Sequence, residues 1–166
     1  MVRICRLARA GHWNIRLSQA DEIGKLVFGF FNEVGIINQL ATRQLESKLP
    51  DGLLISHFGV INHLMRLGDG RTPLQIATAH QVPKTTMTHT LAGLKKAGLI
   101  EFAPNPKDAR SKCVLLTDAG RRFHAEAIAA IMPEFQALLG DIPADQFAAA
   151  LPFLQRVRAY MDAARD

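Results

Sequence analysis

Residues 72–123 read TPLQIATAHQVPKTTMTHTLAGLKKAGLIEFAPNPKDARSKCVLLTDAGRRF, and this stretch decides the fold. It opens on Thr72 and Pro73, a hydrogen-bonding N-cap followed by a proline at the first helical position, which predict a short helix over residues 73–80. After a turn, apolar residues at three- and four-residue steps predict a second helix over residues 84–97, which a glycine ends. Two short helices joined by a tight turn are typical of a helix-turn-helix.

The pattern changes after Gly98. Residues 99–103 and 112–116 are short, largely apolar runs that predict the two strands of a hairpin. The eight residues between them, PNPKDARS, are turn formers and are expected to make a loop that carries Lys107 and Arg110. A helix-turn-helix followed by a hairpin with a basic tip is a winged helix-turn-helix.

Long helices are predicted on both sides of this lobe. Before it, Ser18 is the expected N-cap of an amphipathic helix over residues 18–49, whose apolar residues face more than one side. Such a helix packs against its own core and against a partner subunit. Ser56 is the expected cap of a shorter helix that Gly68-Asp69-Gly70 breaks.

After the hairpin, Thr117 is the expected cap of a helix to about Leu139, in which Pro133 is a place for a bend. A last helix is predicted over residues 144–163. The fold class is therefore mostly α with a small β-hairpin wing, a winged helix-turn-helix with long flanking dimerisation helices. The predicted segments are a basic N-terminal arm (1–17), an N-terminal dimerisation helix and linker (18–55), a winged helix-turn-helix lobe (56–116) and C-terminal dimerisation helices (117–166).

Positive charge is concentrated in the lobe. The chain has a net charge of +5, whereas residues 71–122 alone hold nine bases and three acids, a net charge of +6. A basic block on an otherwise nearly balanced chain suits a polyanionic partner such as double-stranded DNA. A basic face that is merely solvated gives the same pattern.

The second helix of a helix-turn-helix enters the major groove of DNA by its N-terminal end. That end carries side chains able to hydrogen-bond phosphates or base edges, and we expect these to bind DNA: Lys84, Thr85, Thr86, Thr88 and His89. The hairpin can place Arg110 in the minor groove, where the negative potential attracts arginine.

At these residues the chain resembles the MarR (multiple antibiotic resistance regulator) family. The resemblance covers about residues 72–123 and includes the wing signature Asp108-Ala109-Arg110 and the strand-exit signature Leu116-Thr117-Asp118-Ala119-Gly120. It implies that Arg110 is the minor-groove arginine and that Asp108 braces it. The chain departs from the family pattern at Gln81, where the turn often has glycine, and at Pro83, where a capping serine is common.

The resemblance also implies a homodimer that represses nearby genes and leaves a pseudo-palindromic operator when it binds a small aromatic or lipophilic effector. An apolar lining for that ligand could come from Phe30, Phe31, Phe58 and Met65, although a packed core explains these side chains equally well. The alternative function is a winged-helix protein-interaction module without a specific DNA site.

Other classes of function find no support in the sequence. We recognise no catalytic motif, cofactor site or metal-ligand spacing, so we expect neither an enzyme nor a metalloprotein. Cys113 lies in an apolar strand, which predicts a buried structural thiol, and Cys5 lies in the basic arm. With no secretory signal, no apolar run of membrane-spanning length and no disulfide framework, a cytoplasmic location and no membrane contact are expected.

Overall fold

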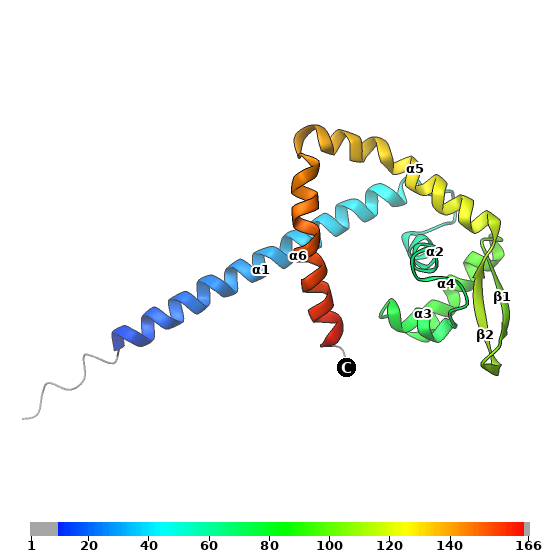
Figure 1. Cartoon of the computed structure of the whole chain (residues 1–166), viewed down its shortest axis with the longest axis horizontal. Coiled ribbons are helices and arrows are strands. Elements are labelled where there is room, and N and C mark those ends of the chain that lie inside the picture. Colours follow the sequence, from blue (N-terminus) through cyan, green and yellow to red (C-terminus); the bar gives the residue numbers. More distant parts are fainter. Residues whose placement is uncertain (1–9, 165–166) are drawn as a thin grey trace, which may run out of the picture. The chain divides into compact units, whose positions relative to one another are not determined.

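A computed structural model describes residues 10–164 of the chain, and the side chains of residues 19–164. Cys5 and most of the predicted N-terminal arm therefore lie outside the described residues. In order along the chain (Figure 1), the elements are α1 (Ala10–Glu46), α2 (Ile55–Leu67), α3 (Pro73–Ala79), α4 (Lys84–Lys96), β1 (Ile100–Asn105), β2 (Asp108–Leu116), α5 (Asp118–Asp141) and α6 (Ala144–Ala163). This architecture confirms the predicted fold class, mostly α with an antiparallel hairpin.

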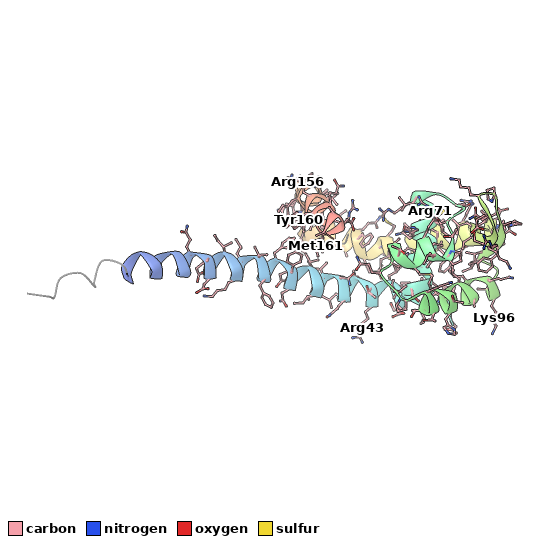
Figure 2. The ribbon with its side chains drawn as sticks, turned by 90° about the horizontal axis from the view of Figure 1, so that it is seen from below. Arg43, Arg71, Lys96, Arg156, Tyr160 and Met161 are labelled. Carbon is pink, nitrogen blue, oxygen red and sulfur yellow. The ribbon has the colours of Figure 1, made fainter. Side chains whose placement is uncertain are left out.

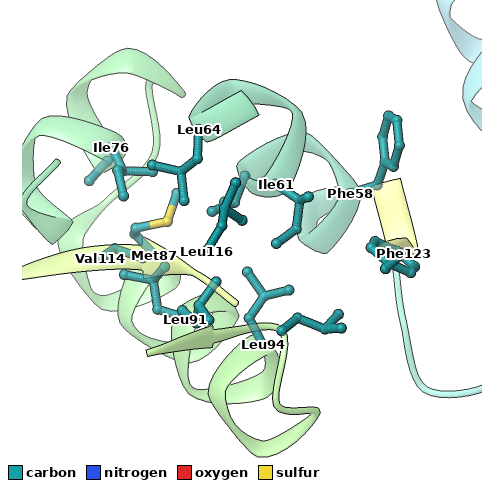
Figure 3. Packing of buried hydrophobic residues seen from close by; sticks show 14 of the residues in the cluster. Phe58, Ile61, Leu64, Ile76, Met87, Leu91, Leu94, Val114, Leu116 and Phe123 are labelled. Carbon is teal, nitrogen blue, oxygen red and sulfur yellow. The ribbon is translucent and has the colours of Figure 1, made fainter. Parts of the chain in front are cut away.

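The chain divides into two compact units, residues 1–44 and 45–166. The core belongs to the second unit, where α2, α3, α4, the hairpin and the first half of α5 meet. Figure 3 shows its centre, in which the apolar positions of α4 face those of α2 and β2. The most deeply buried large side chains are Val60, Ile61, Leu64, Ile76, Leu91, Leu94, Ile100 and Val114.

The turn between α3 and α4 is built as the sequence suggests, with one exception. The Thr72 hydroxyl accepts a hydrogen bond from the backbone N–H of Gln75, and the Gln75 side chain accepts one from the N–H of Thr72, which makes a reciprocal cap. Gln81 has a φ of 55°, the left-handed conformation that favours glycine. The turn geometry that usually calls for glycine is therefore present, and a glutamine adopts it.

The start of α2 differs from the prediction. The helix begins at Ile55, and the side chain that accepts the N–H of Leu54 is the imidazole of His57 (Nδ1, 2.9 Å), with the Glu46 carboxylate accepting the N–H of Ile55 (3.1 Å). Ser56 lies inside the first turn, so its assignment as the N-cap is wrong. The N-cap residue is Leu54, and His57, the third helical residue, takes the place that glutamate or glutamine has in a capping box.

The first helix also starts earlier than expected. α1 begins at Ala10 instead of after Ser18, so Ser18 lies within the helix and residues 10–17 are not an extended arm. From Ile23 to Leu40 most of its large apolar side chains are exposed within this unit. An exposed apolar stripe of this length is typical of a helix surface that packs against another element or subunit.

The hairpin strands are longer than predicted. β1 continues to Asn105 and β2 begins at Asp108, so only Pro106 and Lys107 separate the strands, and the prediction of an eight-residue loop is wrong. The strands extend into this run of turn-forming residues. Near the tip, side-chain hydrogen bonds take the place of some of the backbone hydrogen bonds between the strands. On its other side, β2 forms a bridge with Arg71: the Val114 N–H donates to the Arg71 carbonyl (2.9 Å), and the Val114 carbonyl accepts the N–H of Gly70 (3.0 Å).

The last two helices match their predicted ranges closely. The Thr117 hydroxyl accepts the N–H of Gly120 (3.0 Å) and donates to the Gly98 carbonyl (2.7 Å), which confirms Thr117 as the cap of α5. α5 runs through Pro133 as one helix. No side chain of α6 among its described residues is buried within this single chain.

Candidate nucleic-acid interface

α4, the second helix of the helix-turn-helix, presents its polar residues to solvent. Met87, Leu91 and Leu94 are buried on the inner side of α4. The five side chains predicted to meet DNA are all exposed: Lys84, Thr85, Thr86, Thr88 and His89. They share the N-terminal half of the helix, the part that reaches base edges when such a helix enters a major groove.

Two threonines on this helix have their hydroxyl hydrogens already engaged. Thr88 Oγ1 donates to the Lys84 carbonyl (2.8 Å) and Thr90 Oγ1 donates to the Thr86 carbonyl (3.2 Å). Each hydroxyl oxygen can still accept a hydrogen bond, and each side chain keeps a methyl group. In the major groove, such a threonine suits the amino group of cytosine or adenine, or the methyl group of thymine.

The first turn of α4 has no side-chain cap. Pro83 occupies the N-cap position with φ −55° and ψ 146°, and its ring offers no acceptor. The first backbone N–H groups of the helix therefore remain available, with Lys84 beside them. Free N–H groups at a helix N-terminus beside a lysine are suited to bind a phosphate group.

The tip of the wing carries two exposed bases, Lys107 and Arg110. Asp108 is also exposed, and its Oδ1 accepts a hydrogen bond from the backbone N–H of Arg110 (3.0 Å). Within residues 19–164, no ion pair joins the Asp108 carboxylate to the Arg110 guanidinium. Asp108 thus holds the backbone beneath Arg110 and leaves the guanidinium to face solvent.

Not every base counted in the lobe is equally available to DNA. Arg121 forms a short ion pair with Asp69, whose other carboxylate oxygen accepts the N–H of Leu116 (3.3 Å). Lys95 lies over the ring of Phe102, 5.5 Å from its centroid. Lys96 is exposed and points away from the end of α4 (Figure 2).

Two histidines of the lobe, His63 and His80, pack against each other. His63 and His80 lie side by side, with ring centroids 5.2 Å apart. Burial lowers the pKa of both rings, and the nearby charges of His80, Arg71 and Arg66 lower the pKa of His63 further. Among the described residues, no group of three potential metal ligands comes together.

The residues suggested for an effector pocket are not equivalent. Phe58 belongs to the core, where its ring stacks on His124 (centroids 5.6 Å apart, planes 3° apart). Met65 is exposed on the same helix. Phe30 and Phe31 contact each other edge to face on α1, in the other unit. Phe58 thus has a packing role, and Met65 is the accessible one of the two on α2.

Three polar residues that support the interface were not recognised in the sequence: Asp69, Asn105 and Ser111. Asp69 joins the wing to α5, whereas Asn105 and Ser111 bond to each other across the wing tip. Asn105 stands directly before a proline in a turn-rich run, which is a signal for a side chain that caps a turn. Cys113 is buried in β2, as its apolar surroundings in the sequence predict.

No helix within the part of the chain that the structure describes is both long and apolar enough to cross a lipid bilayer.

Comparison with known proteins points to one family. Residues 51–111 match the model of the MarR family, a range that includes α2 to α4 and the wing tip. No curated protein sequence matches the chain.

Solved structures extend the likeness beyond the lobe. The chain is similar to wild-type MarR from E. coli in its apo form, with 25% identity, a TM-score of 0.65, and coverage of 76% of this chain and 94% of that one. A cysteine-to-serine mutant of E. coli MarR in complex with operator DNA gives 24% identity and a TM-score of 0.65, covering 79% and 94%. A MarR transcriptional regulator from Methanosarcina mazei Go1 gives 17% identity and a TM-score of 0.72, covering 81% and 97%.

The winged helix, its wing signature and the family model agree with the fold shared over most of the chain. Over residues 51–111 the chain is thus similar to the MarR family, and it shares its fold with solved MarR transcriptional regulators.

Proposed function

We propose that the chain forms a homodimeric repressor that binds a pseudo-palindromic operator and leaves it when a small aromatic or lipophilic molecule binds. The observation that carries the proposal is the pairing of two exposed elements on one lobe. The uncapped N-terminal end of α4 offers donors for a major groove, and the wing tip offers Lys107 and Arg110 for the neighbouring minor groove. The E. coli MarR mutant, similar in fold, was solved on its operator DNA.

The dimer is supported by apolar surface that one chain leaves in water. On α1, Phe28 is 74% exposed. On α6, Tyr160 is 79% exposed and Met161 is exposed beside it (Figure 2). Because a single chain rarely exposes so many large apolar side chains on its terminal helices, a second copy is the partner that we propose for them.

Sedimentation at micromolar concentration tests this part, and we expect about twice the chain mass of 18.3 kDa. A monomer at that concentration would contradict the proposed dimer, and with it the prediction that the operator is pseudo-palindromic. Selection of bound fragments from genomic DNA should then return sites with two half-sites about one helical turn, roughly 10 bp, apart. Binding without a preferred sequence would favour the alternative, a winged helix used for protein contact.

The direct test of the interface is Arg110→Ala. Loss of one good groove contact should weaken DNA binding by about 1–3 kcal/mol and leave the dimer intact. Arg43→Ala is the matched control, because it removes the same charge from an exposed position on α1 (Figure 2). The wing assignment is wrong if Arg110→Ala binds the selected site as tightly as the parent protein does.

The trigger that we propose is a bound molecule and not oxidation of a thiol. Cys113 is buried, and a buried thiol in apolar surroundings reacts slowly. The accessible apolar side chains Phe31 and Met65 are candidates to contact a small aromatic compound. The test measures DNA release from the parent protein and from a Cys5→Ser, Cys113→Ser double variant, with a panel of small aromatic compounds and with organic hydroperoxide. Release by hydroperoxide in the parent alone would refute the proposed trigger.

A further inference from the structure

The wing tip contains an irregularity that changes the direction of β2. The strands pair in register up to Pro104, which lies opposite Lys112. The next pair is Asn105 with Asp108, so residues 109–111 on β2 have no partner on β1. An unpaired insertion of this kind bends its strand and turns the side chains that it carries. Arg110 lies at its centre.

Side-chain hydrogen bonds close the gap that the missing backbone pairs leave. Asn105 Nδ2 donates to Ser111 Oγ at 2.7 Å, and these are the two residues that an unbroken register would have placed opposite each other. Ser111 Oγ in turn donates to the Asp108 carbonyl (3.2 Å). Asn105 Oδ1 accepts the backbone N–H of Lys107 (3.0 Å). The four residues thus form one connected network around the bulge.

Burial separates the residues of the network from the residues that face solvent. Asn105 and Ser111 are half-buried and turned toward each other, whereas Lys107 and Arg110 are exposed. A side chain that spends its hydrogen-bonding groups inside the wing has fewer left for DNA. The exposed bases are therefore the ones available for contact, and the half-buried pair fixes the backbone that carries them.

We propose that Asn105 and Ser111 are positioning residues, which hold the bulge so that Arg110 and Lys107 are presented to DNA in one fixed geometry. The inference rests on the proposed function of the wing. It adds that affinity depends on two residues that do not touch DNA themselves. Ordering a mobile loop on binding costs free energy, and a tip that is already fixed avoids this cost. The Asn105–Ser111 hydrogen bond keeps the tip fixed in the free protein.

The first experiment uses two variants of Ser111 with nearly the same shape. Ser111→Thr keeps the hydroxyl and Ser111→Val lacks it, while both have a branched side chain that suits a strand. We expect Thr to bind the selected operator like the parent, and Val to lose about 3- to 12-fold in affinity, the equivalent of one hydrogen bond. Equal affinities for the two variants would overturn the role of Ser111.

The second experiment is a double-mutant cycle between Asn105→Ala and Arg110→Ala, read as operator affinity, with the thermal midpoint as a measure of folding. A positioning role predicts that Asn105→Ala weakens binding in the parent and costs clearly less once Arg110 is absent, when only Lys107 remains to be positioned. An equal loss in both backgrounds would mean that Asn105 does not act through Arg110, and would overturn the inference.

The same cycle separates this inference from the proposed function. A parent protein that binds no DNA site contradicts the function. A parent that binds, and loses affinity with Arg110→Ala but not with Asn105→Ala, keeps the function and overturns the positioning role. Since the tip is at the surface, we expect the thermal midpoint to change little in all four proteins, and a large fall in Asn105→Ala would mark a role in folding instead.

Discussion

Gly120 lies close against the backbone of Leu99, and replacing it with alanine should destabilise the fold severely. A Cβ at this position would lie 2.1 Å from the Leu99 carbonyl oxygen and 3.1 Å from the carbonyl carbon. The obstacle is backbone and not the end of a flexible side chain. The last residue of the strand-exit signature is therefore glycine because the first turn of α5 packs directly on the start of the hairpin.

The size of the effect follows from what must move. Overpacking of a tightly packed site costs about 1–3 kcal/mol. In addition, the Leu99 carbonyl accepts the N–H of Thr117 (3.2 Å), and withdrawing it weakens a hydrogen bond worth about 1 kcal/mol. We therefore expect Gly120→Ala to lower the free energy of unfolding by about 3 kcal/mol, equivalent to a fall in Tm of about 6–12 °C for a chain of this length.

The assay is urea unfolding at one fixed protein concentration, in which the midpoint should fall while the slope stays constant. Gly140→Ala is the control on the same helix, because an added Cβ there meets nothing within 4 Å. A helical glycine in open space should tolerate alanine or gain up to about 1 kcal/mol from it. A Gly120→Ala protein as stable as the parent would show that the close approach of α5 to the hairpin does not exist.

Three further predictions concern stability. Thr117→Ala should cost about 1–2 kcal/mol in urea unfolding, because the hydroxyl both caps α5 and donates to the Gly98 carbonyl after α4, whereas Thr117→Ser should cost much less. Gln81→Gly should stabilise the fold by about 0.5–1 kcal/mol, because it relieves a left-handed φ of 55°, and a destabilised variant would contradict that backbone geometry. Burial lowers the pKa of His57, His63 and His80 below the ordinary value of 6.5, so as the pH falls the unfolded chain binds protons before the folded chain does. The urea midpoint should therefore fall as the pH drops below about 6.5. A midpoint that stays constant to roughly pH 5 would refute this.

Local chemistry made much of the lobe predictable. Thr72 and Thr117 cap their helices as expected, and Gly98, with a φ of 71°, ends α4. These signals are short in range, since a cap is recognised from residues within one turn of it. The exposure of Thr88 and His89 was predictable for the same reason, because the apolar spacing of Met87, Leu91 and Leu94 sets the inner side of the helix.

The predictions that failed depended on contacts that a local pattern does not contain. The sequence favours Ser56 as the cap of α2, but the N-cap is Leu54, whose N–H is accepted by the His57 ring. The other side of that ring packs so closely on α4 that a Cβ on Gly93 would lie 2.6 Å from His57 Nε2. The wing strands were predicted too short because Asn105 and Ser111 read as loop residues. Their mutual bond, six residues apart, holds the tip together and is visible only in three dimensions.

The count of charges in the lobe also missed contacts between segments that are distant in the sequence. It placed Arg121 with the other bases of the lobe, yet this side chain pairs with Asp69, 52 residues earlier in the chain. A sequence gives the sign and the order of charges, and pairing between distant segments decides which of them remain for a partner. For Lys84, Lys96, Lys107 and Arg110, which are exposed, the count and the structure agree.

The apolar side chains that α6 leaves in water have a consequence for gene control. In the proposed dimer, the active species forms from two copies, so its abundance falls faster than the amount of protein in the cell when most chains are single. Growth and division would then dilute the regulator and empty its operator more sharply than a monomeric regulator would allow. Tyr160 and Met161, far along the chain from the residues proposed to bind DNA, would set the copy number at which the gene switches.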